Sequence, residues 1–120
     1  MFTIDDIGAM LDDLATELPQ EFYNELNGGV NLLPETKMYD DPRAGELYIL
    51  GEYHHDVMGR YIVVYYGSLM VKYEHCTAAQ MRESLRKLLI HEFTHHLESL
   101  AGEHGLEDKD EERLEGYRNT

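Results

Sequence analysis

The sequence predicts an α+β domain in which a small mixed β-sheet packs against a long C-terminal helix and a shorter N-terminal helix. Three observations predict it. Apolar residues recur at helical spacing near the N-terminus, two apolar runs in the middle are rich in β-branched and aromatic residues, and the last third has a capped helical pattern. A chain of 120 residues is the size of one domain, so we expect a single domain over 1–120.

The N-terminal helix begins at Thr3, because Thr3 and Asp6 match the spacing of a capping box. Pro19 ends it, and a second short helix is expected around 22–26, closed by Gly28 and Gly29. The run Val30 to Leu33 predicts a short strand that Pro34 stops. The apolar stripe of the first helix consists of Ile4, Ile7, Leu11, Leu14 and Leu18.

The middle of the chain predicts a β-hairpin. A strand is expected over 47–50, extending toward Tyr53, and a second over 61–66, joined by a turn at 54–59 that contains His54 and His55. We expect a loop over 35–46, because it holds Pro42, Gly45 and several charges, and one more strand over 69–73.

The last third predicts a helix that starts at a capping box formed by Thr77 and Gln80 and runs to about Ala101, with Gly102 as its C-cap. Its apolar residues occupy more than one face, so the middle of the helix is expected to be covered on several sides. A final short helix is expected over 110–117.

The charge balance excludes two classes of partner. Ten Lys and Arg against twenty-four Asp and Glu give a net charge of −14. No basic patch is available for nucleic acid or for an anionic membrane surface.

The acidic N-terminus is unlike a signal peptide, and no run approaches the roughly 18 apolar residues of a membrane span. A single cysteine, Cys76, allows no internal disulfide, so we expect a cytoplasmic protein.

The sequence His91-Glu92-Phe93-Thr94-His95 is an HExxH motif inside the predicted C-terminal helix. Residues four apart lie on one helical face, about 5–6 Å between Cβ atoms, so His91 and His95 can share a tetrahedral Zn²⁺. Glu92 lies beside the metal and can take a proton from a zinc-bound water and deliver it to a leaving amine. The apolar residues that precede the motif favour this interpretation over an incidental pair of surface histidines.

A third protein ligand is needed, and a returning chain supplies it better than the same straight helix. The helix extends roughly 10 Å beyond His95, and an extended return at about 3.3 Å per residue regains that level within 105–108. Asp108 is favoured there, in the GxxD element that begins at Gly105. Glu98, on the helix itself, is interpreted as a carboxylate that orients an imidazole or as a surface charge. The alternatives to Asp108 are Glu107, Asp110, His104 and Glu98.

The stretch from Leu89 to Leu97, followed by Glu111-Glu112-Arg113-Leu114-Glu115, resembles the small zincin-like metallopeptidase family of compact bacterial proteins. The family's motif is similar to HExxHxxGxxD, with two histidines and a later acid as zinc ligands and the glutamate as general base. The resemblance implies a minimal zincin-like fold, His91 and His95 as ligands and Glu92 as catalytic base. The chain departs from the motif at Glu98, which stands where the shorter form of the motif has glycine.

The expected activity is therefore zinc-dependent hydrolysis of a peptide or protein substrate. Two alternatives stay open. One is a zinc-binding or catalytically degenerate module that acts through protein interaction, and the other is a regulatory protease that cleaves a repressor. The sequence leaves the substrate and the oligomeric state undetermined.

Several other residues are assigned structural roles. His96 is expected to be a hydrogen-bonded core histidine, because it lies about 100° around the helix from His95. His54 and His55 are interpreted as solvated turn residues, and Cys76 as a half-buried hydrophobe. A tyrosine such as Tyr117 could donate a hydrogen bond to an oxyanion, but nothing in the sequence selects which tyrosine.

Overall fold

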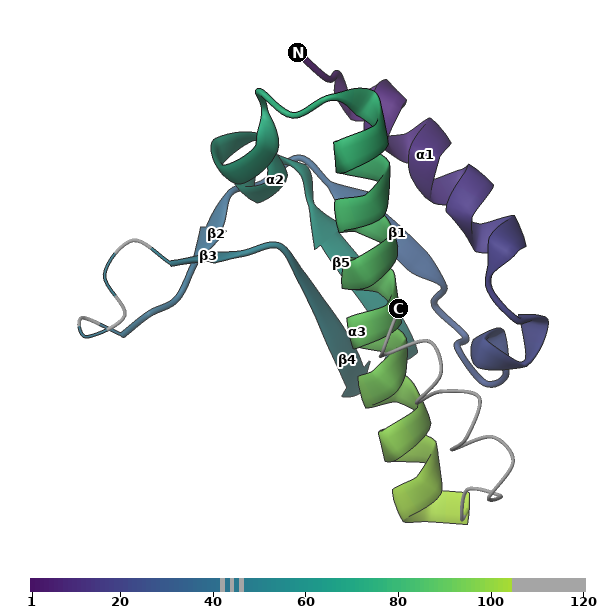
Figure 1. Ribbon diagram of the computed structural model, residues 1–120. Helices are drawn as coiled ribbons and strands as arrows, with labels where there is room; N and C mark the ends of the chain where they lie inside the picture. Colours follow the sequence, from purple (N-terminus) through teal and green to yellow (C-terminus); the bar gives the residue numbers. More distant parts are fainter. Residues whose placement is uncertain (42, 44, 46, 105–120) are drawn as a thin grey trace.

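The computed structural model describes residues 1–41, 43, 45 and 47–104. It shows an α+β architecture in which helices lie against one three-stranded sheet (Figure 1). In chain order the elements are α1 (Ile4–Glu17), the 3₁₀ turn η1 (Gln20–Tyr23), β1 (Val30–Leu33), β2 (Lys37–Met38), β3 (Tyr48–Ile49), β4 (Gly51–Asp56), β5 (Gly59–Tyr65), α2 (Tyr66–Tyr73) and α3 (Ala78–His104).

The main sheet is mixed, as predicted, with the strand order β1-β5-β4. β4 and β5 form a hairpin, as predicted, and pair antiparallel, with Gly51 opposite Val64 and Asp56 opposite Gly59. The first strand of the hairpin is not the predicted 47–50, because Tyr48 and Ile49 form β3 and pair with β2 instead. β1 pairs parallel with β5. β5 therefore lies in the centre of the sheet, and β4 is an outer strand.

β2 and β3 form a separate antiparallel pair, with Lys37 opposite Ile49 and Met38 opposite Tyr48. We call this pair and the flanking Tyr39 and Leu47 the arm. The arm projects from the body of the molecule on the side where β4 lies (Figure 1). Leu50 alone separates β3 from β4.

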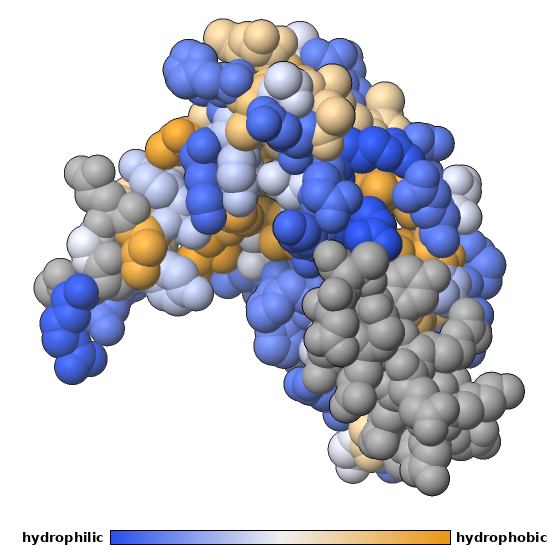
Figure 2. Space-filling model, viewed as in Figure 1, coloured by the Kyte–Doolittle hydropathy of each residue, from blue (hydrophilic) through white to orange (hydrophobic). Residues whose placement is uncertain are grey.

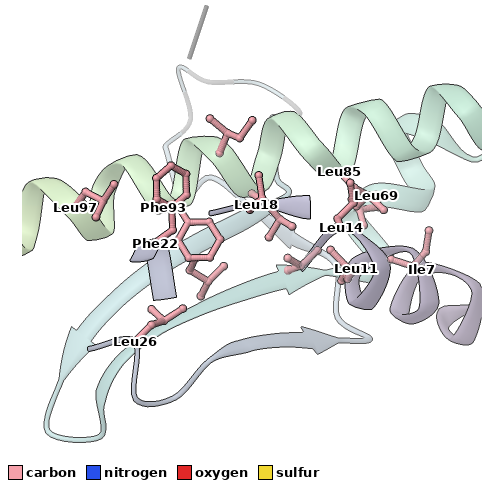
Figure 3. Close-up of a cluster of buried hydrophobic side chains, with 14 of the residues drawn as sticks. Ile7, Leu11, Leu14, Leu18, Phe22, Leu26, Leu69, Leu85, Phe93 and Leu97 are labelled. Carbon is pink, nitrogen blue, oxygen red and sulfur yellow. The ribbon is translucent and has the colours of Figure 1, made fainter. Parts of the chain in front are cut away.

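The hydrophobic core lies between α1, α3 and the sheet (Figure 3). α1 begins at the predicted capping box and buries Ile7, Leu11 and Leu14. α3 contributes side chains from several turns, so its middle is covered on more than one side, as predicted. Its core residues are Met81, Leu85, Leu89, Ile90, Phe93, Leu97 and Leu100.

Two predicted elements are wrong in type or extent. The segment expected to be a strand over 69–73 is the helix α2, because Tyr66, Leu69, Met70 and Tyr73 recur at helical spacing and all four contact the core. The predicted helix around 22–26 is only the 3₁₀ turn η1.

Three boundaries also differ. β4 extends through His54 and His55 to Asp56, so these histidines lie in a strand and not in the turn. The loop expected over 35–46 contains β2. α3 continues past Gly102 to His104, because Gly102 keeps a helical backbone rather than the positive φ of a C-cap glycine. The short helix expected over 110–117 lies outside the described residues.

No helix in the described part of the chain combines the length and the apolar character needed to cross a membrane.

Candidate metal centre

The HExxH motif lies in the second half of α3. The helix is capped at its start, because the backbone N–H of Gln80 donates to the Thr77 hydroxyl at 3.1 Å and the Gln80 amide accepts from the Thr77 backbone N–H at 2.9 Å. Around the motif the helix changes character from one residue to the next: His91 and His95 are exposed, whereas Glu92 and Phe93 are buried. The helix therefore presents two imidazoles on an open face and anchors that turn in the core.

The two imidazoles have the separation that a shared metal requires. The Nε2 atoms of His91 and His95 are 3.2 Å apart, and the rings are nearly perpendicular at 86°. Two nitrogens bound to one tetrahedral Zn²⁺ at about 2.05 Å each lie about 3.3 Å apart. The potential ligand atoms of His91, Glu92 and His95 all lie within 4.8 Å of one another. The residues that the structure describes therefore fit a zinc ion through two histidines.

Glu92 lies beside this pair in a different environment. Its side chain is only 4% exposed, and burial raises the pKa of its carboxyl to about 7, with the negative charge of Glu52 as the second cause. Glu52 itself is ion-paired with Lys37, whose Nζ is 2.7 Å from its Oε1. A carboxyl that titrates near neutral pH can both accept and return a proton.

The motif opens onto a groove of about 650 Å³ between α3 and the edge of the sheet. One wall is α3, the floor is β4, and the arm forms the opposite wall (Figure 2). The residues that line it are Tyr39, Ile49, Gly51, Glu52, Tyr53, His91, Glu92, His95, Glu98 and Ser99.

The floor of the groove offers backbone groups that face away from the sheet. The carbonyl of Leu50 accepts a hydrogen bond from Tyr65 N–H at 2.9 Å, on the β5 side of the strand. Backbone groups of an antiparallel strand alternate between its two edges, so those of Gly51, Tyr53 and His55 point away from β5. No strand in the described part of the chain pairs with this edge of β4.

Gly51 brings β4 and α3 close together at the groove. A Cβ on Gly51 would lie 3.0 Å from the Val63 carbonyl oxygen and 3.2 Å from Leu88 Cδ1 of α3. A Cβ there would require its neighbours to shift by a few tenths of an ångström, so glycine favours the close approach of the strand edge to the motif helix.

Glu98 lies near His95 on the same helix, at a distance longer than a hydrogen bond, so its orienting role stays a prediction. Its Oε2 is 3.9 Å from Nδ1 of His95, which is the ring nitrogen that does not face His91. Asp108, Glu107 and Asp110 lie outside the described residues, as does the side chain of His104. The third ligand therefore stays a prediction.

His96 is a core histidine, as predicted, and it is fully buried. Its Nε2–H donates to the Asn24 carbonyl at 2.7 Å, so Nδ1 accepts from the Tyr53 hydroxyl at 2.8 Å. Burial lowers the pKa of His96, which keeps the ring neutral and supports this arrangement. The Tyr53 oxygen accepts in turn from Arg60 Nη1 at 3.1 Å, and the same Nη1 also donates to Ser99.

Sequence reasoning missed this buried chain of polar groups. It joins β4, β5 and α3 to Asn24, the residue that follows η1, and it commits the Tyr53 proton to His96. Strand alternation places Tyr53 and His55 on one face of β4. No pattern in the sequence indicates that Arg60 donates a hydrogen bond to the Tyr53 hydroxyl. His54 stacks on Tyr61 and His55 lies 3.8 Å from Glu103, and neither is among the residues that line the groove. Cys76 is half-buried, as expected.

Comparison with solved structures shows a protein that is similar to this chain over most of its length. No family model and no curated protein matches the chain. The solved structure of a conserved hypothetical protein from Thermo thermophilus superposes with a TM-score of 0.66 and 31% sequence identity. The match covers 83% of this chain and 98% of that one.

The chain belongs to the same family as that protein. The relationship supports the α+β fold described above. This similarity concerns fold and family, so the proposed chemistry rests on the site of this chain alone.

Proposed function

We propose that the protein is a zinc-dependent metallopeptidase whose general base is Glu92. The observation that carries the proposal is the pair of exposed imidazoles, with Nε2 atoms 3.2 Å apart, next to a carboxyl that is only 4% exposed. The two Nε2 atoms are also within hydrogen-bond distance of each other, so the buried Glu92 beside them is what favours a metal site over a simple pair of surface histidines. A peptidase needs this combination, because the metal ligands must be accessible and the base must have a pKa near the working pH.

Zinc would be held by Nε2 of His91 and of His95, with Asp108 as the proposed third ligand. The structure describes α3 as far as His104, nine residues beyond His95. Asp108 is proposed as the third ligand from the sequence alone. A bound zinc would supply Lewis acidity toward a carbonyl oxygen and toward water.

Glu92 would move the protons. Its carboxylate would take a proton from the attacking water and pass it to the amine that leaves when the peptide bond breaks. Glu98 would orient the His95 ring through Nδ1. The buried hydrogen bonds of His96 and Tyr53 would hold α3 in register against β4, so that the imidazoles face the groove.

The substrate would be an extended peptide. The outward backbone groups of Gly51, Tyr53 and His55 can pair with such a chain as an additional strand. The groove lies along this edge, which would place a peptide bond beside His91 and His95.

The first test is metal binding. We expect wild-type protein to bind one zinc and His91→Ala to lose at least about 100-fold in affinity, measured by competition with a chromophoric chelator. His75→Ala is the matched control, because the His75 side chain is 94% exposed and stands on the connection between α2 and α3. Equal zinc binding by wild type and His91→Ala would contradict the proposal.

The second test separates an enzyme from a zinc-binding module. We expect zinc-loaded wild type to cleave members of a peptide library, read by mass spectrometry, and Glu92→Gln to bind zinc but to cleave at least about 100-fold more slowly. Equal cleavage by the two proteins, or cleavage by neither, would favour a module that acts through protein interaction.

A further inference from the structure

Two exposed apolar side chains of the arm share one face of it. Tyr39 is 56% exposed and Leu47 is 53% exposed. Tyr39 N–H donates to the Leu47 carbonyl at 3.0 Å, so the two residues are directly opposite each other and project to the same side. We call Tyr39, Leu47 and Ile49 the inner face of the arm. Lys37 is opposite Ile49 on the same side, and its ammonium is ion-paired with Glu52 at 2.7 Å.

The inner face is turned toward the groove, because Tyr39 and Ile49 are among its lining residues. Met38 and its partner Tyr48 project to the opposite side of the arm, because side chains alternate along a strand. Figure 2 shows apolar surface on the arm and within the hollow beside it. The wall across the groove is polar and consists of His91, Glu92, His95, Glu98 and Ser99.

We infer that the inner face of the arm is the subsite that recognises one large apolar side chain of the substrate, aliphatic or aromatic. The inference rests on the proposed function, in which an extended peptide pairs with β4. Every second side chain of such a peptide points to the α3 side of the sheet and enters the space between α3 and the arm. A side chain next to the bond beside His91 and His95 then meets Tyr39, Leu47 and Ile49.

The position of the arm supports this occupant. The arm is joined to β4 through Leu50 alone, so a peptide on the β4 edge must pass beside it. None of the described residues from 37 to 49 belongs to the core or packs against it. The exposed apolar residues of the inner face are therefore not explained by folding, and burial against a substrate side chain is favourable.

The experiment uses zinc-loaded Glu92→Gln protein, so that peptides bind without being consumed. Fluorescent peptides that carry Ala, Lys, Leu or Phe at each position in turn are titrated and followed by anisotropy. At one position we expect Leu or Phe to bind about tenfold more tightly than Ala. Adding Tyr39→Ser or Leu47→Ser is expected to remove this preference, whereas Tyr39→Phe retains it.

Met38→Ser is the matched control, because Met38 is a neighbouring exposed apolar residue on the other side of the arm. It is expected to keep the preference. A preference that survives both Tyr39→Ser and Leu47→Ser, or peptides that bind without any preference, would overturn the inference. So would a dimer, detected by sedimentation, that Tyr39→Ser dissociates, because the inner face would then bind a second copy.

The two proposals fail in different ways. Cleavage by wild type with no apolar preference overturns the subsite and leaves the peptidase standing. A binding preference that depends on Tyr39, without cleavage by the zinc-loaded wild type, overturns the peptidase and leaves the subsite.

Discussion

At the scale of single residues, the burial of Glu92 has a consequence for the metal-free protein. Its pKa is raised from 4.5 to about 7, first by burial and then by Glu52. The folded protein therefore holds a proton that the unfolded chain has already released between these two values. Stability falls as the pH rises through this window, and the loss is complete above it.

We expect Glu92→Gln to remove this dependence. In chelator-treated protein the substitution should raise the free energy of unfolding by about 1 kcal/mol at pH 5 and by about 3 kcal/mol at pH 8. Urea denaturation at both pH values measures it. Glu98→Gln is the control on the same helix, since Glu98 is exposed. A gain that does not change with pH would show that the Glu92 carboxyl titrates normally.

The buried hydroxyl of Tyr53 gives a second prediction. Tyr53→Phe leaves Nδ1 of His96 without its donor and removes one acceptor of Arg60. An unsatisfied buried polar group costs about 1–3 kcal/mol, so we expect a loss of that size in the free energy of unfolding, measured with urea. Tyr48→Phe, on the arm, should change it by less than about 0.5 kcal/mol. Equal stability of Tyr53→Phe and wild type would mean that these hydrogen bonds are replaced by water.

At the scale of elements, the contact between β4 and α3 depends on Gly51. A Cβ there would lie 3.2 Å from Leu88 Cδ1 and 3.0 Å from a backbone oxygen that cannot move freely. We expect Gly51→Ala to lower the free energy of unfolding by about 1–3 kcal/mol and to weaken zinc binding, because it pushes the motif helix from the strand edge.

Gly102→Ala, in the motif helix α3, is expected to change stability in the opposite direction to Gly51→Ala. Gly102 is exposed, and nothing described lies within 4 Å of a Cβ built there. Alanine is the better helix former, so we expect a gain of about 0.5–1 kcal/mol. Thermal and urea denaturation compare the two variants. If both shift stability in the same direction, steric contact at Gly51 is not the cause.

The elements also show how far sequence reasoning reaches. The hairpin, α1 and α3 follow from strong periodicity and capping residues, and the motif's place on α3 follows from them. For α2 the local sequence predicts a strand, because Leu69, Val71 and Tyr73 favour extended structure. The contacts of Leu69 and Met70 with the core stabilise a helix instead, and the local sequence does not predict these tertiary contacts.

The site is predictable in part for the same reason. His91, Glu92 and His95 follow from spacing along one helix. The burial of Glu92, and the hydrogen bonds that Tyr53 and Arg60 make to α3, depend on how β4 and β5 pack against that helix. The position of the arm beside the motif depends on tertiary structure, and the spacing of apolar residues in the sequence does not predict it.

At the scale of the whole molecule, zinc is expected to stabilise the fold, because the ligand set exists only in the folded chain. At a free zinc concentration about 100 times the dissociation constant, the gain is about 2.7 kcal/mol. Differential scanning fluorimetry with and without a chelator should show a higher melting temperature for zinc-loaded wild type and no shift for His91→Ala. A similar shift in His91→Ala would indicate nonspecific binding to the acidic surface.

The attachment of the arm has a consequence for engineering and for divergence among relatives. Its described residues contribute nothing to the hydrophobic core, and a single residue connects it to β4. The arm is also held to the body at Lys37, whose backbone forms two hydrogen bonds with the buried Ser68 hydroxyl. An arm of different sequence or length beyond Lys37 can therefore be exchanged without disturbing the folding of the body. Under the proposed function, preference for a substrate would be a portable property, carried by a short segment that can be grafted from one relative to another while the helix that carries His91, Glu92 and His95 stays the same.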